Sequence, residues 1–198
     1  MHQITPPDHS THSKKRYSRS NYTPPTQPPT DLTRIGILSD THSYLDEQLF
    51  DYFEECHEIW HIGDVGDPTV TDRLQAFRPL RAVYGNIDGR KIRAQFPEDA
   101  HFEVDGVRVF MTHIGGYPGR YNARVRGILT ETRPKLYLAG HSHILKVMPD
   151  RKLDLLHINP GAAGNHGWHK VRTAIRLTLD AGRIGEVQVI ELGHRGRG

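Results

Sequence analysis

The chain has very little cysteine, since Cys56 is the single one among 198 residues. No disulfide can form within the chain, which agrees with a reducing compartment. Long apolar runs are also missing, because no stretch approaches the roughly 18 consecutive apolar residues of a membrane helix. The first thirty residues lack the apolar segment of a secretory signal. We therefore expect a cytoplasmic protein with no membrane association.

Charge of one sign is not in large excess, since the formal net charge is +3 at pH 7 and the pI is about 9.0. Residues 1–31 carry +2 and residues 194–198 carry another +2, which leaves −1 for residues 32–193. Because the basic excess lies at the two ends, it does not favour a nucleic-acid-binding surface on the body of the protein. Self-association remains open.

The composition divides the chain into three parts. Residues 1–31 hold six of the thirteen prolines among many Ser, Thr and His. Such a segment buries too little apolar surface to offset its ordering entropy, so we expect a disordered N-terminal arm. Residues 32–193 have the length of one domain, for which roughly 100–200 residues is typical. Residues 194–198 form a basic C-terminal tail.

Apolar runs, helical spacing and turn signals predict alternating strands and helices in the first half and hairpins later. The expected helices are Asp46–Cys56, Pro68–Phe77 and a segment from Tyr121 to Leu129. The expected strands are Arg34–Ser39, Glu58–Ile62, Pro79–Tyr84, His101–Val104, Val107–Thr112, Lys135–Ala139, Ile144–Met148, Leu153–Ile158, Val171–Leu179 and Ile184–Ile190. Strand–helix alternation favours parallel pairing, and Asp105-Gly106 is a strong hairpin signal. We expect an α/β protein with two packed sheets and outer helices.

Side chains that bind metals follow five of these strands. In chain order they are Asp40 and His42, Asp64, Asn86 and Asp88, His113, and finally His141 and His143. In open α/β sheets, ligands bind beyond the carboxyl ends of the strands, so these residues should converge. Imidazole, carboxylate and amide groups suit Mn, Fe, Ni, Zn or Mg better than a soft copper site. A shared carboxylate can bridge two ions about 3.5–4 Å apart, so we expect a two-metal site.

These motifs resemble those of the calcineurin-like metallophosphoesterase superfamily. The matching residues are Asp40-x-His42, Gly63-Asp64, Gly85-Asn86, His113 and Gly140-His141-x-His143. Two longer segments, Gly36-Ile-Leu-Ser-Asp40-Thr-His42 and Ile158-Asn-Pro-Gly161, are similar to the small bacterial and archaeal phosphodiesterases of the YfcE type. The resemblance covers residues 34–190. It implies a four-layer α/β/β/α sandwich of two mixed sheets with helices outside.

The resemblance also implies two divalent metal ions, Mn first, with Ni, Fe, Zn or Mg as alternatives. One ion would take Asp40, His42, Asp64 and His143, and the other Asp64, Asn86, His113 and His141, with Asp64 bridging. The implied activity is hydrolysis of a small phosphate ester, in the first place a phosphodiester, by a hydroxide that bridges the ions. The residues expected to carry catalysis are Asp40, His42, Asp64, Asn86 and His113.

One position departs from the superfamily pattern. Many members have a histidine after the Gly-Asn pair that helps the leaving group depart. This chain has Ile87 at that position, and the YfcE-type subgroup also lacks the histidine. Isoleucine cannot donate a proton, so we expect leaving groups of low pKa or a proton from another source. We expect Asp88 to orient a ligand by hydrogen bonding. Arg120 is a candidate phosphate partner, the alternative being a solvated helix residue.

The segment His57-Glu58-Ile59-Trp60-His61 matches the HExxH pattern of zinc proteases, which requires a helix. In the predicted strand, positions four apart lie roughly 13 Å apart and cannot share one ion, so we reject a protease. Histidines without a motif, among them His157, His166 and His169, are interpreted as surface or packed residues. Both tryptophans are interpreted as packing residues of the core or of the site's rim.

Two other functions remain open. The fold implied by the resemblance also resembles a retromer subunit that serves as a scaffold and whose catalytic histidines are degraded. Every expected ligand is present here, which favours an enzyme over a non-catalytic, metal-binding scaffold. A phosphomonoesterase or a cyclic-nucleotide diesterase would use the same ligands. Comparing turnover of monoesters and diesters separates these activities.

Overall fold

The computed structural model of the protein describes residues 32–196. The arm expected over residues 1–31 and the last two residues of the expected tail lie outside this range. The elements in chain order are β1 (Thr33–Leu38), α1 (Gln48–Tyr52), β2 (Glu58–Ile62), α2 (Pro68–Phe77), β3 (Leu80–Val83), α3 (Arg90–Gln95), β4 (Asp99–Val104), β5 (Val107–Thr112), α4 (Ala123–Thr132), β6 (Leu136–Leu138), β7 (Lys146–Asp150), β8 (Leu155–Asn159), β9 (Val171–Asp180) and β10 (Arg183–His194).

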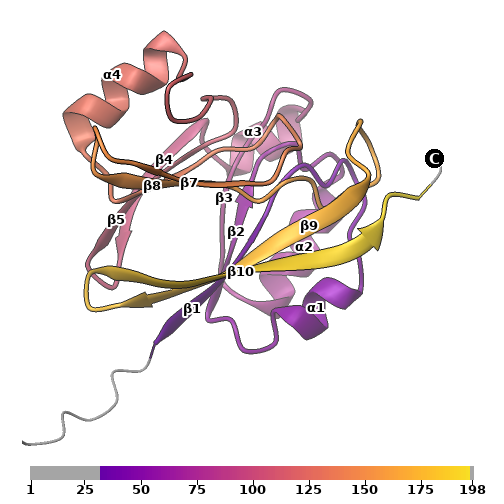
Figure 1. The fold of residues 1–198 in the computed structure, drawn as a ribbon. Coiled ribbons are helices and arrows are strands. Elements are labelled where there is room, and N and C mark those ends of the chain that lie inside the picture. Colours follow the sequence, from indigo (N-terminus) through magenta and orange to yellow (C-terminus); the bar gives the residue numbers. More distant parts are fainter. Residues whose placement is uncertain (1–31, 197–198) are drawn as a thin grey trace, which may run out of the picture.

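The strands form two five-stranded mixed sheets. The first sheet has the order β10-β9-β1-β2-β3 and the second the order β4-β5-β6-β8-β7. In each sheet three strands are parallel, β1-β2-β3 and β5-β6-β8, and the remaining strands join antiparallel. Figure 1 shows the two sheets packed face to face, with α4 outside the second sheet and α1 and α2 outside the first. The four-layer sandwich of two mixed sheets is confirmed.

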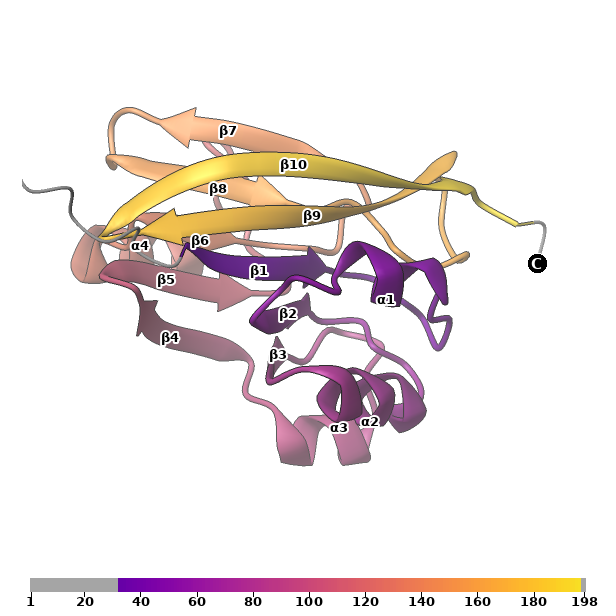
Figure 2. The same ribbon diagram turned by 90° about the horizontal axis from the view of Figure 1, so that it is seen from below.

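Three apolar clusters fill the spaces between these layers. The central cluster lies between the sheets and contains Trp60 from β2 and Met111 from β5, both fully buried. A second cluster packs α1, α2 and α3 against the first sheet, and a third packs α4 against the second sheet. Strands β1 and β5, one from each sheet, end on the same side of the molecule (Figure 2). The loops that follow strands of both sheets can therefore meet there.

Local signals explain the elements that the sequence predicts best. Helix α2 begins at Pro68, as predicted, because the Asp67 side chain accepts a hydrogen bond from the Thr69 N–H at 2.8 Å. The β4–β5 hairpin turns at Asp105 and Gly106, both with positive φ, as a tight two-residue turn requires. Strand β2 occupies the range expected for it.

Several boundaries differ from the prediction. Helix α1 is shorter than Asp46–Cys56. It begins at Gln48, whose N–H donates to the Asp46 carboxylate at 3.0 Å, and it ends at Tyr52, after which the chain continues in turns up to Cys56. Strand β7 continues through Pro149 because it is an edge strand, where a missing N–H is tolerated. Helix α3 was not predicted: it has six residues and buries only Ile92. None of the helices described is long and apolar enough to cross a membrane.

Candidate metal centre

The seven expected ligands lie in the loops that follow five strands. Asp40 and His42 follow β1, Asp64 follows β2 and Asn86 follows β3, so the first sheet supplies four of them. The second sheet supplies the rest, with His113 after β5 and with His141 and His143 after β6. Six of the seven side chains form two groups whose ligand atoms lie within 4.8 Å of one another. The convergence expected from the sequence is therefore present.

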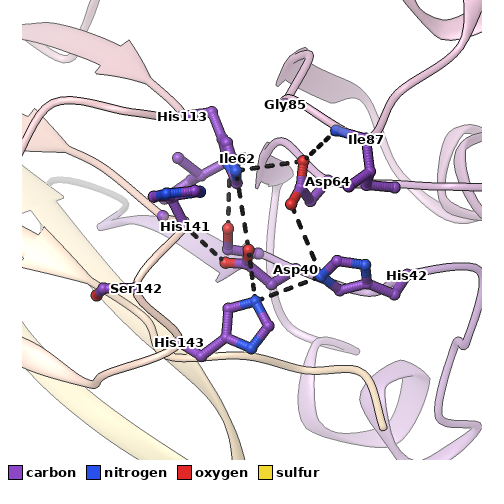
Figure 3. Close-up of polar contacts among 12 residues, drawn as sticks. Asp40, His42, Ile62, Asp64, Gly85, Ile87, His113, His141, Ser142 and His143 are labelled. Atoms are coloured by element: carbon purple, nitrogen blue, oxygen red, sulfur yellow. Dashed lines mark hydrogen bonds and ion pairs between the residues drawn. The ribbon is translucent and has the colours of Figure 1, made fainter. Parts of the chain in front are cut away.

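The first cluster consists of Asp40, His42 and His143. The Nε2 atoms of the two histidines lie 3.3 Å apart, and His143 Nε2 is 3.1 Å from Asp40 Oδ1 (Figure 3). Asp40 is fully buried, and its Oδ1 has no hydrogen-bond partner among the described residues. A buried carboxylate oxygen without a partner is costly unless a cation balances it. The cluster therefore fits a bound metal ion.

The second cluster consists of Asp64, His113 and His141. His113 Nδ1 donates to the Ile62 carbonyl at 2.7 Å, which fixes the proton on Nδ1 and leaves the Nε2 lone pair free. That Nε2 atom is buried without a hydrogen-bond partner in the described part of the chain, 3.2 Å from Asp64 Oδ1. The Ile62 carbonyl thus fixes the orientation of the His113 ring with Nε2 available to a metal ion. Ligating histidines in metal sites are commonly oriented by such a hydrogen bond from their other ring nitrogen.

Asp64 is the residue that reaches both clusters. Its Oδ1 atom lies 3.2 Å from His113 Nε2, and its Oδ2 atom lies 3.7 Å from His42 Nε2 (Figure 3). The Ile87 N–H donates to the same Oδ1 at 3.1 Å, which holds the carboxylate in this orientation. Asn86 lines one cavity together with His42, Asp64, His141 and His143. The Asp64 carboxylate therefore lies within reach of both clusters.

The electrostatics of the site favour a positive charge between the clusters. Burial pushes the pKa of Asp64 upward, but the His113 imidazole 3.2 Å away and the Ile87 N–H outweigh it, so this pKa is lowered. Burial lowers the pKa of His42 despite the nearby carboxylates Asp64 and Asp40. Burial also lowers the pKa of His113, but the nearby carboxylates of Asp64 and Asp40 outweigh burial, so this pKa is raised. The Asp64 carboxylate therefore stays ionised, which suits a cation.

The ligand loops adopt unusual backbone conformations. Five of the seven expected ligands have positive φ, with values of 54° for Asp40, 47° for His42, 53° for Asp64, 66° for His141 and 56° for His143. This region is disfavoured for residues with a Cβ, and such strain clusters at functional sites. Nothing in the sequence marks these positions, since all five are ordinary ligand types rather than glycine. The loops are thus shaped for the positions of the ligands.

Gly85 leaves room for the Asp64 carboxylate. A Cβ atom at Gly85 would lie 2.0 Å from Asp64 Oδ1 and 2.3 Å from the Asp64 backbone nitrogen. No side chain fits there without moving the candidate bridging carboxylate. The glycine before Asn86 is therefore required by close approach.

Asp88 holds two ligand loops together rather than contacting a ligand side chain. Its Oδ2 atom accepts from the Gly85 N–H at 2.7 Å, and its Oδ1 atom accepts from the Gly66 N–H at 2.8 Å. These two glycines belong to the loops that carry Asn86 and Asp64. Arg120 is exposed and lines neither of the two cavities that adjoin the clusters. Its expected contact with phosphate finds no support in this geometry.

The segment that matches the zinc-protease pattern lies in β2 from Glu58 onward, as predicted, whereas His57 directly precedes the strand. His61 is fully buried, and its Nε2 atom lies 2.9 Å from the Thr41 hydroxyl. His57 Nδ1 instead accepts from the Arg34 N–H at 2.9 Å. The two histidines have different partners in different places, so they do not share an ion. Burial lowers the pKa of His61 to about 4, which keeps it neutral.

A cavity of about 540 Å³ opens from the clusters, and we call it the metal-site cavity. Its lining residues are His42, Asp64, Asn86, Ile87, His141, Ser142, His143, Ile144, His166, Gly167, Trp168 and His169. The ring centroid of His166 lies 4.8 Å from that of His42, and His169 lies 5.3 Å from His143. Sequence reasoning missed both histidines because they stand outside any motif, between β8 and β9.

The two tryptophans differ from each other. Trp60 is fully buried between the sheets, which confirms the packing interpretation for this residue. Trp168 is 100% exposed, so it is not a core residue and only a place at the rim of the site remains for it. Its indole lines the metal-site cavity without being enclosed by the protein.

Comparison with known proteins agrees with this site. A sequence profile described as the calcineurin-like phosphoesterase superfamily domain matches residues 33–182. A probable metallophosphoesterase of Methanothermobacter thermautotrophicus is 31% identical over 134 residues, which is 65% of this chain and 76% of that protein. A second, from Methanocaldococcus jannaschii, is 30% identical over 134 residues, 65% of this chain and 67% of that protein.

Solved structures share the fold. A structure described as a novel archaeal phosphodiesterase superposes with a TM-score of 0.66 at 22% identity, covering 81% of this chain and all of that one. Vps29 from Entamoeba histolytica in complex with Zn²⁺ superposes with a TM-score of 0.63 at 14% identity, covering 81% of this chain and 99% of that one. From the sequence match and the metal-binding geometry together, the chain belongs to the calcineurin-like phosphoesterase superfamily.

Proposed function

We propose that this protein is a phosphodiesterase that depends on two divalent metal ions, with Mn²⁺ as the first candidate. The observation that carries the proposal is the position of Asp64, whose two carboxylate oxygens face one cluster each, at 3.2 Å from His113 Nε2 and 3.7 Å from His42 Nε2. A carboxylate shared in this way is the usual centre of a two-metal hydrolase site. The name of the archaeal phosphodiesterase supports a diester as substrate.

The proposed ligands follow from the two clusters. Asp40, His42, His143 and Asp64 would hold one ion, and Asp64, Asn86, His113 and His141 the other. When bound, such ions supply an activated water and positive charge for the phosphate oxygens. The chain itself contributes ligand geometry: the Ile62 carbonyl fixes the tautomer of His113, and the Ile87 N–H orients Asp64.

The side chain of Ile87 also restricts which leaving groups the proposed reaction accepts. It is 46% exposed and lines the metal-site cavity, at the place where many superfamily members carry a proton-donating histidine. An isoleucine cannot protonate a leaving group, so esters of acidic alcohols and phenols are the preferred substrates. We expect small esters rather than nucleic acids, because the basic excess of the chain lies near its ends.

The test compares the turnover of an aryl phosphodiester and an aryl phosphomonoester. We expect protein stripped with EDTA and reloaded with Mn²⁺ to hydrolyse bis(p-nitrophenyl) phosphate faster than p-nitrophenyl phosphate. Asp64→Asn should lower kcat/KM by at least about 100-fold, since it removes the shared carboxylate charge. Asp72→Asn changes an exposed aspartate of α2 in the same way and should leave activity unchanged.

The likeness to Vps29 keeps a metal-binding scaffold as the second candidate. Loaded protein that is inert towards both esters with Mn²⁺, Ni²⁺, Zn²⁺ and Mg²⁺ would favour the scaffold. Faster turnover of the monoester would instead assign a phosphomonoesterase.

A further inference from the structure

Three exposed apolar side chains line the metal-site cavity. Ile87, Ile144 and Trp168 all line it, with 46%, 56% and 100% of their surface exposed. Large apolar side chains that stay exposed together beside a polar site are characteristic of ligand-binding surfaces. The polar side of the same cavity is formed by the proposed ligands, including Asp64 and His141. A ligand that fills the cavity would therefore touch both an ion and an apolar surface.

The loop that carries Trp168, residues 164–170, is tied down at several points. His169 Nε2 donates to the Gly164 carbonyl at 3.0 Å, which closes the loop on itself. The segment after β10 holds it from outside: the Arg195 N–H donates to the Lys170 carbonyl at 2.9 Å, and the Arg195 guanidinium donates to the Gly167 carbonyl. The backbone below Trp168 is thus fixed before a ligand arrives, which lowers the entropy cost of binding.

Gly167 keeps this loop against the first metal cluster. Its φ is +118°, and a Cβ atom at this position would lie 2.1 Å from Nδ1 of His143. The backbone of the loop therefore lies directly on a proposed ligand, and the next residue in the chain is Trp168. This contact places the indole at the mouth of the metal site.

The charges of the cavity favour a diester over a monoester. Among the described residues that line it, none is lysine or arginine. Positive charge for the phosphate would come from the ions alone. A phosphomonoester carries about −1.5 to −2 charges near pH 7, whereas a diester carries a single one and replaces the other with an ester group. The exposed indole and the two isoleucines offer that ester group an apolar surface.

We propose that the metal-site cavity contains a subsite for a flat aromatic ester group of the phosphodiester, with Trp168 stacking on the ring and Ile87 and Ile144 completing the apolar surface. This inference rests on the proposed function, because it names the substrate class of the same site. Stacking on an exposed aromatic side chain accepts any planar ring, so an aryl ester and a nucleoside ester share the required chemistry.

Binding without turnover gives the first test, because the chain has two tryptophans and Trp60 is buried away from the cavity. In Mg²⁺-loaded protein, diphenyl phosphate should quench the indole fluorescence of Trp168 and bind about tenfold more tightly than diethyl phosphate. Trp168→Ala should abolish the quenching and remove this preference, while Trp168→Phe should retain most of it. Diethyl phosphate should bind all three proteins equally.

Turnover gives the second test. Trp168→Ala should raise KM for bis(p-nitrophenyl) phosphate about tenfold with little change in kcat, because it removes substrate binding and leaves the ion ligands intact. Ile144→Ala should act in the same direction, and Val189→Ala, an exposed residue of β10 outside the cavity, is its matched control. Thymidine 5′-(p-nitrophenyl) phosphate and methyl p-nitrophenyl phosphate share the aryl leaving group and test whether a nucleoside also gains from Trp168.

The outcomes separate this subsite from the proposed function. If Trp168→Ala hydrolyses and binds the aryl diesters as the unmodified protein does, the proposed subsite is contradicted, while the proposed phosphodiesterase activity is supported. If no diester is hydrolysed with any ion yet diphenyl phosphate binds through Trp168, the proposed function fails and the subsite remains. Loss of both diphenyl and diethyl phosphate binding in Trp168→Ala would show a collapsed loop and overturn the stacking role.

Discussion

The imidazole of His157 is enclosed in the second sheet, where it stacks on Tyr137 with 4.9 Å between the ring centroids. It is 1% exposed, and its Nδ1 atom has no partner among the described residues. Burial, assisted by the charge of Lys146, lowers the pKa of His157 to about 4 against an opposing hydrogen bond with the Tyr137 backbone. The folded protein therefore holds this ring in its neutral form.

The sign of the pH dependence follows from that lowered pKa. The unfolded chain binds a proton at His157 near pH 6.5, whereas the folded chain does so only near pH 4. The stability gained from the neutral ring is present above pH 6.5 and is lost as the pH falls towards 4, by up to about 3 kcal/mol. We expect His157→Phe to lose less stability than the unmodified protein between pH 7 and pH 4.5, as measured by urea unfolding in EDTA.

The control for this experiment is His101→Phe, an exposed position on β4 of the same sheet. Other histidines, such as His61, titrate equally in all three proteins, so the difference between their acid slopes isolates His157. Equal slopes for His157→Phe and the unmodified protein would contradict the assignment.

Single residues also show where sequence reasoning succeeds. The residue types of the ligands and their positions after the predicted strands predict the candidate site, because the chemistry of a side chain follows directly from its residue type. The partners of Asp88 could not be predicted in this way. Its carboxylate binds N–H groups of Gly66 and Gly85, and these meet only after two loops have folded together. The fully exposed state of Trp168 likewise depends on a loop tied to a distant segment.

At the scale of elements, α3 acts on the site although it contributes no ligand. Its Arg93 side chain donates to three backbone carbonyls of the preceding loop, those of Asp88 at 2.6 Å, Gly85 at 3.1 Å and Asn86 at 3.4 Å. The guanidinium also lies 4.3 Å from the ring centroid of Tyr84. One side chain thus ties the loop that carries Asn86 to the helix behind it.

We expect Arg93→Ala to weaken Mn²⁺ binding by about 10–100-fold, since outer partners of metal ligands have effects of this size. Arg93→Lys should recover part of the affinity because it restores one donor. Arg90→Ala removes an exposed arginine of the same helix and is the matched control. Calorimetric titration of EDTA-treated protein measures the affinity. An unchanged affinity in Arg93→Ala would mean that the loop holds Asn86 without help from α3.

The contrast between α2 and α3 explains which elements the sequence predicts. Helix α2 has ten residues, a capping Asp67 and Pro68 in its first turn, so its signals are local and its range is predicted as observed. Helix α3 has six residues, of which three are charged, and no side-chain cap. It forms because Ile92 and Phe96 join the cluster beneath the first sheet, which is a tertiary effect that no local pattern contains.

At the scale of the whole molecule, each candidate metal cluster joins the two sheets. Asp40 and His42 from the first sheet meet His143 from the second, and Asp64 from the first meets His113 and His141 from the second. The central apolar cluster also packs the two sheets against each other, and the bond from His113 Nδ1 to the Ile62 carbonyl joins them at the site. An ion bound at either cluster would bind only when both sheets are in place, so it would stabilise the assembled sandwich and not the unfolded chain.

This coupling predicts a rise in thermal stability with Mn²⁺. At about 100 times the dissociation constant, binding to the folded state alone adds about 2.7 kcal/mol per ion, which for a domain of this size raises Tm by about 5–10 °C. EDTA should reverse the rise. Asp64→Asn should lose most of it, because this carboxylate faces both clusters, whereas His143→Ala should lose the part that belongs to one. Asp72→Asn should keep the full rise in differential scanning calorimetry. A Tm that Mn²⁺ leaves unchanged, in protein shown by metal analysis to be loaded, would contradict this coupling. The ions would then bind the unfolded chain as tightly as the folded one.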